Sequence, residues 1–157
     1  MQRICLFPGT FDPITLGHTD IIDRALPLFD KLYIGIGRND KKKPMFSEQQ
    51  RLDWLNTIYK GNHKVEAIVY DGLTVECCKK IEANFILRGI RYVNDFEYEK
   101  AIADMNRSLA NNIETVFLTC LPQYTSVAST LVRDVLKYGG DVSPFLPNVV
   151  RDTINSI

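Results

Sequence analysis

The sequence predicts an α/β protein in which five parallel strands form one sheet with helices on both faces. Five short apolar runs rich in Ile, Val, Tyr and Phe alternate with segments whose apolar residues recur at helical spacing. This alternation is typical of βαβ units, in which successive strands run parallel. The chain has 157 residues, of which 45% are hydrophobic. A chain of about 150 residues buries roughly 70% of its unfolded surface, so we expect one domain over residues 1–157.

The apolar runs are the expected strands, at residues 3–7, 32–37, 65–70, 85–87 and 115–121. The helical patterns cover residues 20–29, 47–59, 74–83, 94–109 and 129–138, and a short last helix is expected to start at Pro147. No internal repeat, low-complexity tract or linker interrupts this order. The expected sheet is therefore Rossmann-like, of the dinucleotide-binding type.

Local signals mark several helix ends. Ser47, followed three residues later by Gln50, forms a capping-box pattern at the start of the second helix. The fifth helix is expected to end at Gly139, because glycine readily adopts the left-handed conformation of a helix cap. Pro27 falls inside the first helical pattern and has no backbone N–H, so we expect a kink or an early end there.

The charge balance restricts the possible partners. Lys plus Arg number 19 and Asp plus Glu also number 19, so the formal net charge is zero. This balance argues against a surface that binds nucleic acid generally, but it allows a locally cationic site. No apolar run approaches the roughly 18 residues that span a bilayer, and Pro8 interrupts the N-terminal run too early for a signal peptide. We expect a cytoplasmic protein that contacts neither nucleic acid nor a membrane.

The four cysteines, Cys5, Cys77, Cys78 and Cys120, contain no C-x-x-C pair. In a reducing compartment they are best interpreted as small buried apolar residues. The chain has two histidines, too few and too far apart in sequence to indicate a zinc site.

The unusual polar residues follow the predicted strands. In open parallel sheets, ligands bind beyond the carboxyl ends of the strands. The segments that leave these ends are residues 8–18, 38–44, 71–74, 88–91 and 122–130. We expect these segments to meet at one edge of the sheet.

The residue types in these segments are those that bind polyphosphates. Glycine lets backbone N–H groups approach a ligand closely, helix N-termini add oriented N–H donors, and Arg and Lys neutralise phosphate. The sequence contains neither a G-x-x-x-x-G-K-[ST] loop nor a G-x-G-x-x-G pattern. These absences argue against a P-loop NTPase and against a dinucleotide oxidoreductase.

Five ordered blocks of sequence resemble one enzyme family. Residues 15–18, Thr-Leu-Gly-His, resemble the T/H-x-G-H signature of the nucleotidyltransferase superfamily. Within it, the chain is similar to the bacterial phosphopantetheine adenylyltransferases, whose motifs occur here in the same order. These blocks are residues 8–15, 42–46, 88–91, 95–99 and 145–147, so the resemblance covers nearly the whole chain.

The resemblance implies that the adenylyl group of ATP is transferred to 4′-phosphopantetheine, giving dephospho-coenzyme A and pyrophosphate. This is the penultimate step of coenzyme A biosynthesis. It also implies Mg²⁺ that enters with ATP and is held mainly by phosphates and water, without protein ligands. A homohexamer and feedback binding of coenzyme A are further implications. The attacking phosphate is already mostly ionised at neutral pH, so the reaction needs no strong protein base.

The resemblance also assigns roles to individual residues. His18 would stabilise the transition state at the α-phosphate, assisted by Lys42 and Arg88 as catalytic cations. The acceptor substrate would contact Thr10, Lys42, Leu73, Thr74, Arg88, Met105 and Asn106. ATP would contact Thr10, Phe11, His18, Gly89, Ile90, Arg91, Glu99, Tyr124, Thr125, Ser126, Val127, Ala128, Ser129 and Thr130.

One position departs from the superfamily pattern. The second signature usually reads I-S-S-T-x-x-R, whereas here it reads V-A-S-T-L-V-R over residues 127–133. Ala128 has no hydroxyl group, so we expect Ser129 and Thr130 to be the hydroxyl donors of this segment.

Simpler interpretations exist for the same residues. Without its motif, His18 could have the structural role of capping a helix and no catalytic role. Lys41–Lys43 could be part of a solvated loop, and Arg88 and Arg91 could form ion pairs with acidic neighbours. Two other functions also remain open. One is another T/H-x-G-H nucleotidyltransferase, with a nicotinamide mononucleotide or cytidylyl substrate. The other is a nucleotide-binding regulatory module without turnover.

Overall fold

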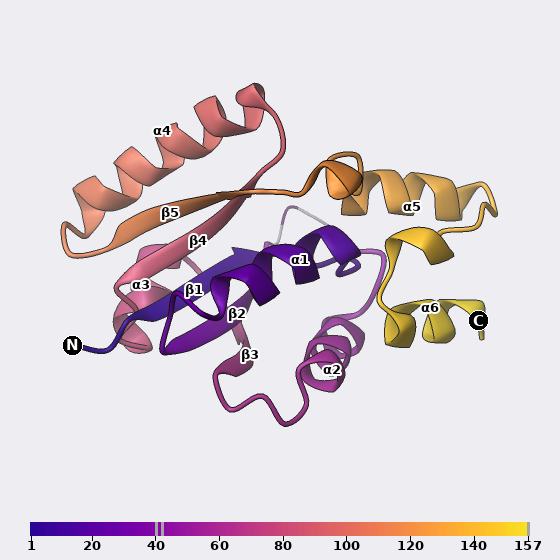
Figure 1. Cartoon of the computed structure of the whole chain (residues 1–157), viewed down its shortest axis with the longest axis horizontal. Coiled ribbons are helices and arrows are strands. Elements are labelled where there is room, and N and C mark those ends of the chain that lie inside the picture. Colours follow the sequence, from indigo (N-terminus) through magenta and orange to yellow (C-terminus); the bar gives the residue numbers. More distant parts are fainter. Residues whose placement is uncertain (40, 42, 157) are drawn as a thin grey trace.

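The computed structural model describes residues 1–39, 41 and 43–156. Its strands are β1 (Ile4–Gly9), β2 (Lys31–Gly37), β3 (Val65–Tyr70), β4 (Phe85–Ile90) and β5 (Glu114–Thr119). Its α-helices are α1 (Leu16–Ala25), α2 (Glu48–Ile58), α3 (Thr74–Lys80), α4 (Val93–Leu109), α5 (Ser129–Lys137) and α6 (Asn148–Asn155). Short 3₁₀ turns occupy Pro122–Tyr124 and Ser143–Phe145. β1 begins toward one end of the molecule and α6 lies at the other (Figure 1).

The five strands form one parallel sheet in the order β3-β2-β1-β4-β5. The expected Rossmann-like sheet is confirmed. The chain reverses its direction of travel across the sheet between β1 and β4, which is the point where such folds bind ligands. β1 pairs with β2 along six positions but with β4 at only Cys5 and Leu6. The ladder between β1 and β4 therefore stops well before their carboxyl ends.

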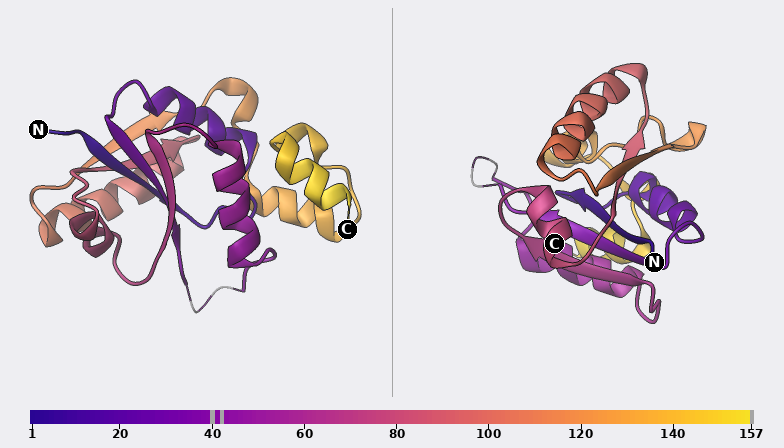
Figure 2. Two further views of the ribbon diagram at one scale, coloured as in Figure 1. Left: turned by 90° about the horizontal axis from the view of Figure 1, so that it is seen from below. Right: turned by 90° about the vertical axis from the view of Figure 1, so that its left-hand side faces the viewer.

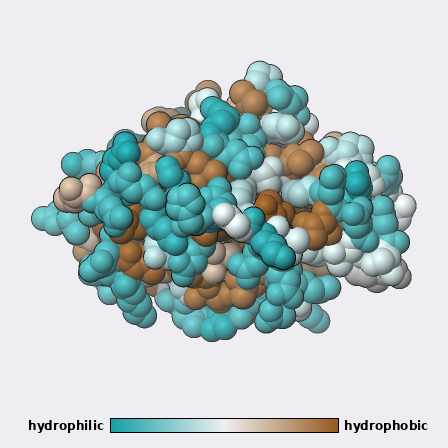
Figure 3. Space-filling model, turned by 60° about the horizontal axis from the view of Figure 1, so that its bottom comes forward, coloured by the Kyte–Doolittle hydropathy of each residue, from teal (hydrophilic) through white to brown (hydrophobic). Residues whose placement is uncertain are grey.

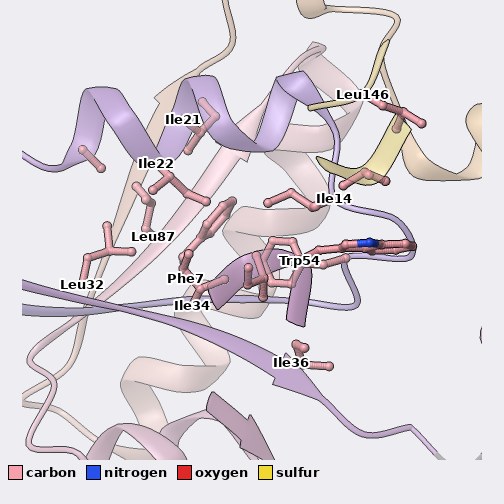
Figure 4. Packing of buried hydrophobic residues seen from close by; sticks show 14 of the residues in the cluster. Phe7, Ile14, Ile21, Ile22, Leu32, Ile34, Ile36, Trp54, Leu87 and Leu146 are labelled. Carbon is pink, nitrogen blue, oxygen red and sulfur yellow. The ribbon is translucent and has the colours of Figure 1, made fainter. Parts of the chain in front are cut away.

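Helices cover both faces of the sheet, as expected (Figure 2). Because side chains alternate along a strand, Phe7 of β1 points to one face and Leu6 to the other. The Phe7 face packs against α1, α2, α5 and α6, with Ile22, Trp54 and Leu87 among its buried residues (Figure 4). The Leu6 face packs against α3 and the turn that follows α4. Fully buried apolar side chains thus lock β1 at the centre of the sheet.

Several helix ends differ from the sequence-based expectation. The first helix begins at Leu16, four residues early, and ends at Ala25, so Pro27 lies beyond it. The early end expected at this proline is confirmed. The fourth helix begins at Val93, where the Asp95 carboxylate accepts the backbone N–H groups of Arg91 and Tyr92. Pro147 precedes α6 as its cap and is not its first helical residue.

β4 is longer than predicted, so Arg88 and Gly89 lie within the strand and not after it. The physical reason is the ladder with β5, in which Arg88 stands opposite Phe117 and Ile90 opposite Thr119. This pairing satisfies the main chain of residues that carry polar or minimal side chains. Pattern alone indicated only the apolar part of the strand.

Within the described part of the chain, no helix is both long enough and apolar enough to cross a membrane. The face drawn in Figure 3 is mostly hydrophilic with smaller hydrophobic patches. Cys5, Cys77 and Cys78 are buried, as expected, whereas Cys120 is only partly buried. All four thiols are free.

Candidate active site

A cavity of about 560 Å³ lies where the carboxyl ends of β1 and β4 separate. Its walls come from the segment after β1, the start of α1, the end of β4 and the segment that leads into α5. α5 and the turn before it lie beyond this edge of the sheet (Figure 1). The convergence of these segments, expected from the strand order, is therefore present in the structure.

A second cavity of about 380 Å³ adjoins the first. It is enclosed by the ends of β2 and β3, the start of α3 and one side of α4. Among the residues that the structure describes, five line both cavities: Pro8, Gly9, Thr10, Arg88 and Glu99. Two ligands placed in the two cavities would therefore meet between Thr10 and Arg88.

The segment after β1 has an unusual backbone. Phe11 has φ 48°, in the left-handed region that non-glycine residues rarely adopt. This conformation folds the Phe11 ring beneath Gly9, where a Cβ atom would lie 2.9 Å from Cζ of the ring. Glycine at position 9 and the turn at Phe11 are therefore needed together. They keep the Gly9 and Thr10 main chain open to both cavities.

His18 lies in the first turn of α1, where its ring is fixed by Thr15. The backbone N–H of Thr15 donates to Nδ1 of His18 at 3.1 Å, and Oγ1 of Thr15 lies 3.0 Å from the same atom. The ring also meets Phe11 edge-on, with 5.1 Å between ring centroids. Because a backbone N–H can only donate, Nδ1 must accept, and the neutral ring carries its proton on Nε2. His18 is thus prepared to donate from Nε2 to a ligand oxygen.

The surroundings of His18 favour its neutral form. Burial, followed by the positive charges of Arg91 and Arg88, lowers the pKa of His18 to about 4. In the free protein at neutral pH, this side chain is therefore a neutral hydrogen-bond donor. An anionic ligand beside it would raise the pKa again, because it would offset the two arginines.

Arg88 is held in place by a carboxylate and a main-chain oxygen. Its Nε and Nη2 donate to the two oxygens of Glu99 at 2.7 and 2.6 Å, and its Nη1 donates to the carbonyl of Pro8 at 2.8 Å. This two-pronged geometry fixes the plane of the guanidinium group. The ion-pair interpretation of Arg88 is confirmed, and the paired side chain also lines both cavities, so its expected role in the site stays a prediction.

Arg91 is bound more loosely. Its Nε lies 3.3 Å from Oδ2 of Asp95, in an ion pair that is more than a quarter exposed on both sides. Such a pair stabilises the fold little, so Arg91 is free to turn toward an anion in the larger cavity. Asp95 lines that cavity as well.

The segment before α5 is joined to the segment after β1. Oγ of Ser129 donates to the carbonyl of Pro13 at 2.7 Å, and Nη1 of Arg133 donates to the carbonyl of Asp12 at 2.6 Å. The single proton of Ser129 is thus engaged within the protein. The Thr130 hydroxyl accepts from Nη2 of Arg133 at 3.4 Å and keeps its own proton for a ligand. Of the two hydroxyl donors expected here, the structure favours Thr130.

The cavities contain most of the site residues expected from the sequence. The larger one is lined by Thr10, Phe11, His18, Arg88, Gly89, Arg91, Glu99, Tyr124, Val127, Ala128, Ser129 and Thr130. The smaller one adds Thr74 and Asn106. Leu73, Ile90, Met105, Thr125 and Ser126 line neither cavity, and their roles stay predictions. Lys42 lies outside the described residues.

The structure also adds residues that the sequence reasoning did not assign to the site. The cavity linings include Asp12, Thr15, Lys43, Asp95 and Arg133, and also Tyr70 and Tyr98 on the smaller side. Asp12, Thr15, Lys43 and Asp95 lie inside the motif blocks, and this position was the sequence signal that could have assigned them to the site. Two of the added residues, Asp12 and Arg133, join separate protein segments: Asp12 accepts the backbone N–H groups of Met45 and Phe46, and Arg133 donates to the carbonyl of Asp12.

The carboxylates of the larger cavity are already engaged by protein donors. Both oxygens of Asp12 accept backbone N–H groups, from Met45 and Phe46, and both oxygens of Glu99 accept from Arg88. Over the described residues, no group of three His, Cys, Asp or Glu side chains is arranged to hold a metal ion. This donor set suits a cation that arrives with a polyphosphate and keeps phosphate and water ligands.

Comparison with known proteins supplies the family. A model of the cytidylyltransferase-like family matches residues 6–135. A phosphopantetheine adenylyltransferase of Flavobacterium psychrophilum is 50% identical over 150 residues, which are 96% of this chain and 99% of the relative. The chain belongs to the phosphopantetheine adenylyltransferase family. Another phosphopantetheine adenylyltransferase, from Phocaeicola vulgatus, is 48% identical over the same share of both chains.

Solved structures agree on the fold. A protein from Vibrio parahaemolyticus assigned as a nicotinate-nucleotide adenylyltransferase superposes with a TM-score of 0.70 over 98% of this chain and 99% of its own. Its sequence identity is 20%, so this likeness supports the fold alone. The two proteins therefore share one fold.

Proposed function

We propose that this protein transfers the adenylyl group of ATP to 4′-phosphopantetheine, forming dephospho-coenzyme A and pyrophosphate. The observation that carries the proposal is the pair of adjoining cavities that meet between Thr10 and Arg88. A reaction that joins two phosphorylated substrates requires such a junction. The full-length similarity to phosphopantetheine adenylyltransferases supports the choice of substrates.

The larger cavity takes ATP and the smaller one takes the pantetheine arm. An oxygen of the phosphopantetheine phosphate forms a bond to the α-phosphorus of ATP. The bond from that phosphorus to the oxygen bridging to the β-phosphate breaks, and pyrophosphate leaves with the electron pair. Because the attacking phosphate is already mostly ionised at neutral pH, the protein need not remove a proton. Its task is to hold the two phosphates in line and to spread the developing charge.

His18 and Arg88 spread the negative charge that develops in the transition state. Nε2–H of His18 donates to a non-bridging oxygen of the α-phosphate, where charge grows in the transition state. Arg88, held by Glu99 and Pro8, presents a fixed cation at the junction of the two cavities. Neither group must reorganise when the reaction occurs, which is the basis of electrostatic catalysis.

Mg²⁺ accompanies ATP in this proposal and neutralises part of the polyphosphate charge. The ion is proposed to be held mainly by the phosphates of ATP and by water. We also propose that residues 1–157 form one nucleotidyltransferase domain. The proposed location is the cytoplasm, which agrees with the four free thiols. Coenzyme A is proposed to bind at the same site and to inhibit the enzyme by feedback.

The chain is also proposed to assemble into a homohexamer, on the resemblance to its family. Large apolar side chains stand exposed along α4, with exposed fractions of 75% for Val93, 69% for Tyr98 and 67% for Met105. A surface of this kind is typical of protein contacts. Sedimentation velocity gives the number of chains, and a monomer at micromolar concentration would contradict this part of the proposal.

The reverse reaction tests the activity and separates the alternatives. Purified protein should form ATP from dephospho-coenzyme A and pyrophosphate, and the yield should depend on added Mg²⁺. A matched assay supplies a nicotinamide dinucleotide or a cytidylyl product instead, which the other members of the superfamily would consume. Folded protein that forms no ATP from dephospho-coenzyme A would contradict the proposed function. Folded protein that consumes none of the three compounds would favour a regulatory module without turnover.

A further inference from the structure

A buried cation stands beneath the site without lining it. Arg51 lies in the second turn of α2 with an exposed fraction of 5%, and it belongs to neither cavity wall. Burying a guanidinium group is costly unless its donors are satisfied. The partners of Arg51 therefore show what it holds together.

Those partners are main-chain carbonyls of two separate segments. Nη1 of Arg51 donates to the carbonyl of Thr10 at 2.8 Å. Its Nε donates to the carbonyl of Phe46 at 3.1 Å and, at 3.4 Å, to that of Ser47. One rigid guanidinium group thus joins the segment after β1 to the end of the loop that follows β2.

Asp12 joins the same two segments from the other side. Its carboxylate, with Asp12 3% exposed, accepts the backbone N–H groups of Met45 at 2.8 Å and Phe46 at 2.9 Å. The carbonyl of Phe46 is bound by Arg51 while its N–H is bound by Asp12. The two segments are therefore fastened by two charged groups, which determine their relative position.

Both fastened segments reach the junction of the cavities. Thr10 lines both of them, and Lys43 and Pro44, which directly precede the fastened residues, line the larger one. A shift of Thr10 relative to these residues would change the shape of the space in which the two phosphates must align. A misplacement of about 1 Å can reduce the rate roughly a hundredfold.

The segment that leads into α5, which faces ATP, is fastened by other bonds. Ser129 donates to the carbonyl of Pro13 and Arg133 to that of Asp12. Neither bond involves Arg51. An Arg51 variant keeps both bonds that hold the segment leading into α5 in the wall of the ATP cavity. The change should therefore displace Thr10, and with it the expected position of the acceptor phosphate, more than this segment.

We propose that Arg51 is a positioning residue for the acceptor phosphate: it fixes the Thr10 segment against residues 43–47 and touches no substrate itself. The inference rests on the proposed function, because the acceptor is the phosphate of 4′-phosphopantetheine. The planar guanidinium group matters because Nε and Nη1 are two separate donor atoms held in fixed directions, one toward each segment, whereas lysine has one donor nitrogen on a flexible stem.

Steady-state kinetics of Arg51→Lys and Arg51→Gln test the inference, with each substrate varied in turn. We expect the KM for 4′-phosphopantetheine to rise and kcat to fall, each about tenfold, while the KM for ATP changes by less than about twofold. Arg51→Lys keeps the positive charge and is therefore the milder change for folding. If Arg51→Gln does not fold, the kinetics of Arg51→Lys alone test the inference.

Trp54→Phe is the matched control. Trp54 lies on the same helix, is 3% exposed, donates from Nε1 to Oγ1 of Thr153 and lines neither cavity. The Trp54 ring also meets the Phe46 ring edge-on, with 5.0 Å between ring centroids. Phenylalanine keeps an aromatic ring at this contact, so the variant should lower the melting temperature without changing either KM. A merely structural Arg51 would give the same result as this control.

The outcomes are distinct. A selective rise of the acceptor KM in Arg51→Lys, absent from Trp54→Phe, would support the inference. Equal changes in both KM values, or unchanged kinetics in a destabilised Arg51→Lys, would overturn it and leave the proposed function intact. A wild-type chain that is folded but inactive in the same assay would refute the proposed function and this inference together.

Discussion

The proposed role of His18 depends on the way in which Thr15 holds its ring. The Thr15 N–H occupies Nδ1, and burial with two nearby arginines disfavours the charged ring. The result is a neutral donor whose proton sits on Nε2, at the N-terminal end of α1, where partial positive charge also favours an anion. A histidine in this state stabilises a growing negative charge without first losing a proton to water.

Removing this donor should affect turnover more than binding. His18→Ala is expected to reduce kcat by about 10²–10³, because one preorganised donor to the transition state is lost, while the KM for ATP changes modestly. Initial-rate kinetics with both substrates measure this. Unchanged turnover would remove His18 from the mechanism.

The charge state of His18 can be observed directly. In NMR spectra of the His63→Gln variant, which retains one histidine, the imidazole signals should titrate with a pKa near 4 in the free protein. Saturating ATP should move this pKa upward, because the anion offsets Arg91 and Arg88. A titration near the usual 6.5 for the free protein would contradict the proposed neutral donor.

At the scale of elements, α2 begins with the capping box that its sequence predicts. The backbone N–H of Gln50 donates to Oγ of Ser47 at 3.2 Å, and Oε1 of Gln50 accepts the N–H of Ser47 at 3.0 Å. This start sets the position of the helix on which Arg51 and Trp54 lie. Local sequence is sufficient here, because the interacting groups are only three residues apart.

The cap should contribute to stability and not to catalysis. Ser47→Ala is expected to lower the free energy of unfolding by about 1 kcal/mol, since one helix N–H loses its side-chain acceptor. Urea denaturation measures the loss. The Ser47 carbonyl that Arg51 binds remains in the variant, so both KM values should stay within about twofold of the wild type.

The ends of the strands can be predicted from local sequence only in part. The ranges of the strands at 32–37 and 65–70 agree within a residue with β2 and β3, because their apolar alternation extends to both ends. β4 continues through Arg88 and Gly89 only because β5 lies beside it and pairs with them. A partner 29 residues away along the chain, as Phe117 is from Arg88, leaves no mark in a local pattern.

At the scale of the whole molecule, the neutral net charge conceals an uneven distribution. Among the described residues, four cationic side chains line the larger cavity, Lys43, Arg88, Arg91 and Arg133, and three carboxylates, Asp12, Asp95 and Glu99, line it too. The positive charge of these cations is therefore partly offset by carboxylates. The carboxylates orient the cations and the main chain, and the phosphates of the substrates complete the charge balance.

The lowered pKa values of His18 and Glu48 imply that the protein loses stability in acid. His18 has a folded pKa below its unfolded value, so the unfolded state gains protons first as the pH falls from about 6.5. Glu48, whose pKa is lowered mainly by its hydrogen bond with Arg38, adds a loss in the same direction below about pH 4.5. Stability should thus decrease as the pH falls, with His18 responsible for the first part.

Urea denaturation between pH 8 and 5 measures this first part. The wild type should lose stability between about pH 6.5 and 5, and His18→Asn should lose clearly less over the same range, because it has no ring to protonate. Equal slopes for the two proteins would show that His18 does not have the lowered pKa.

The sequence by itself determined the α/β class, the order of strands and helices, and the family. Hydrophobic periodicity and capping signals are properties of residues close together in the chain, and the order of the motifs follows from the chain itself, so all three can be recognised without the fold. It also indicated which segments would meet, because the carboxyl ends of parallel strands share one edge. Most of the residues that line the cavities were found in this way.

Only the tertiary structure decided how these residues are held. Glu99 against Arg88, Asp12 against Met45 and Phe46, and Arg51 against Thr10 are contacts between segments 11 to 41 residues apart. Their partners are often main-chain atoms, which every residue carries and which therefore leave no trace in the sequence. The fold decides which carbonyl meets which guanidinium group, and that choice sets the geometry in which two phosphates can react.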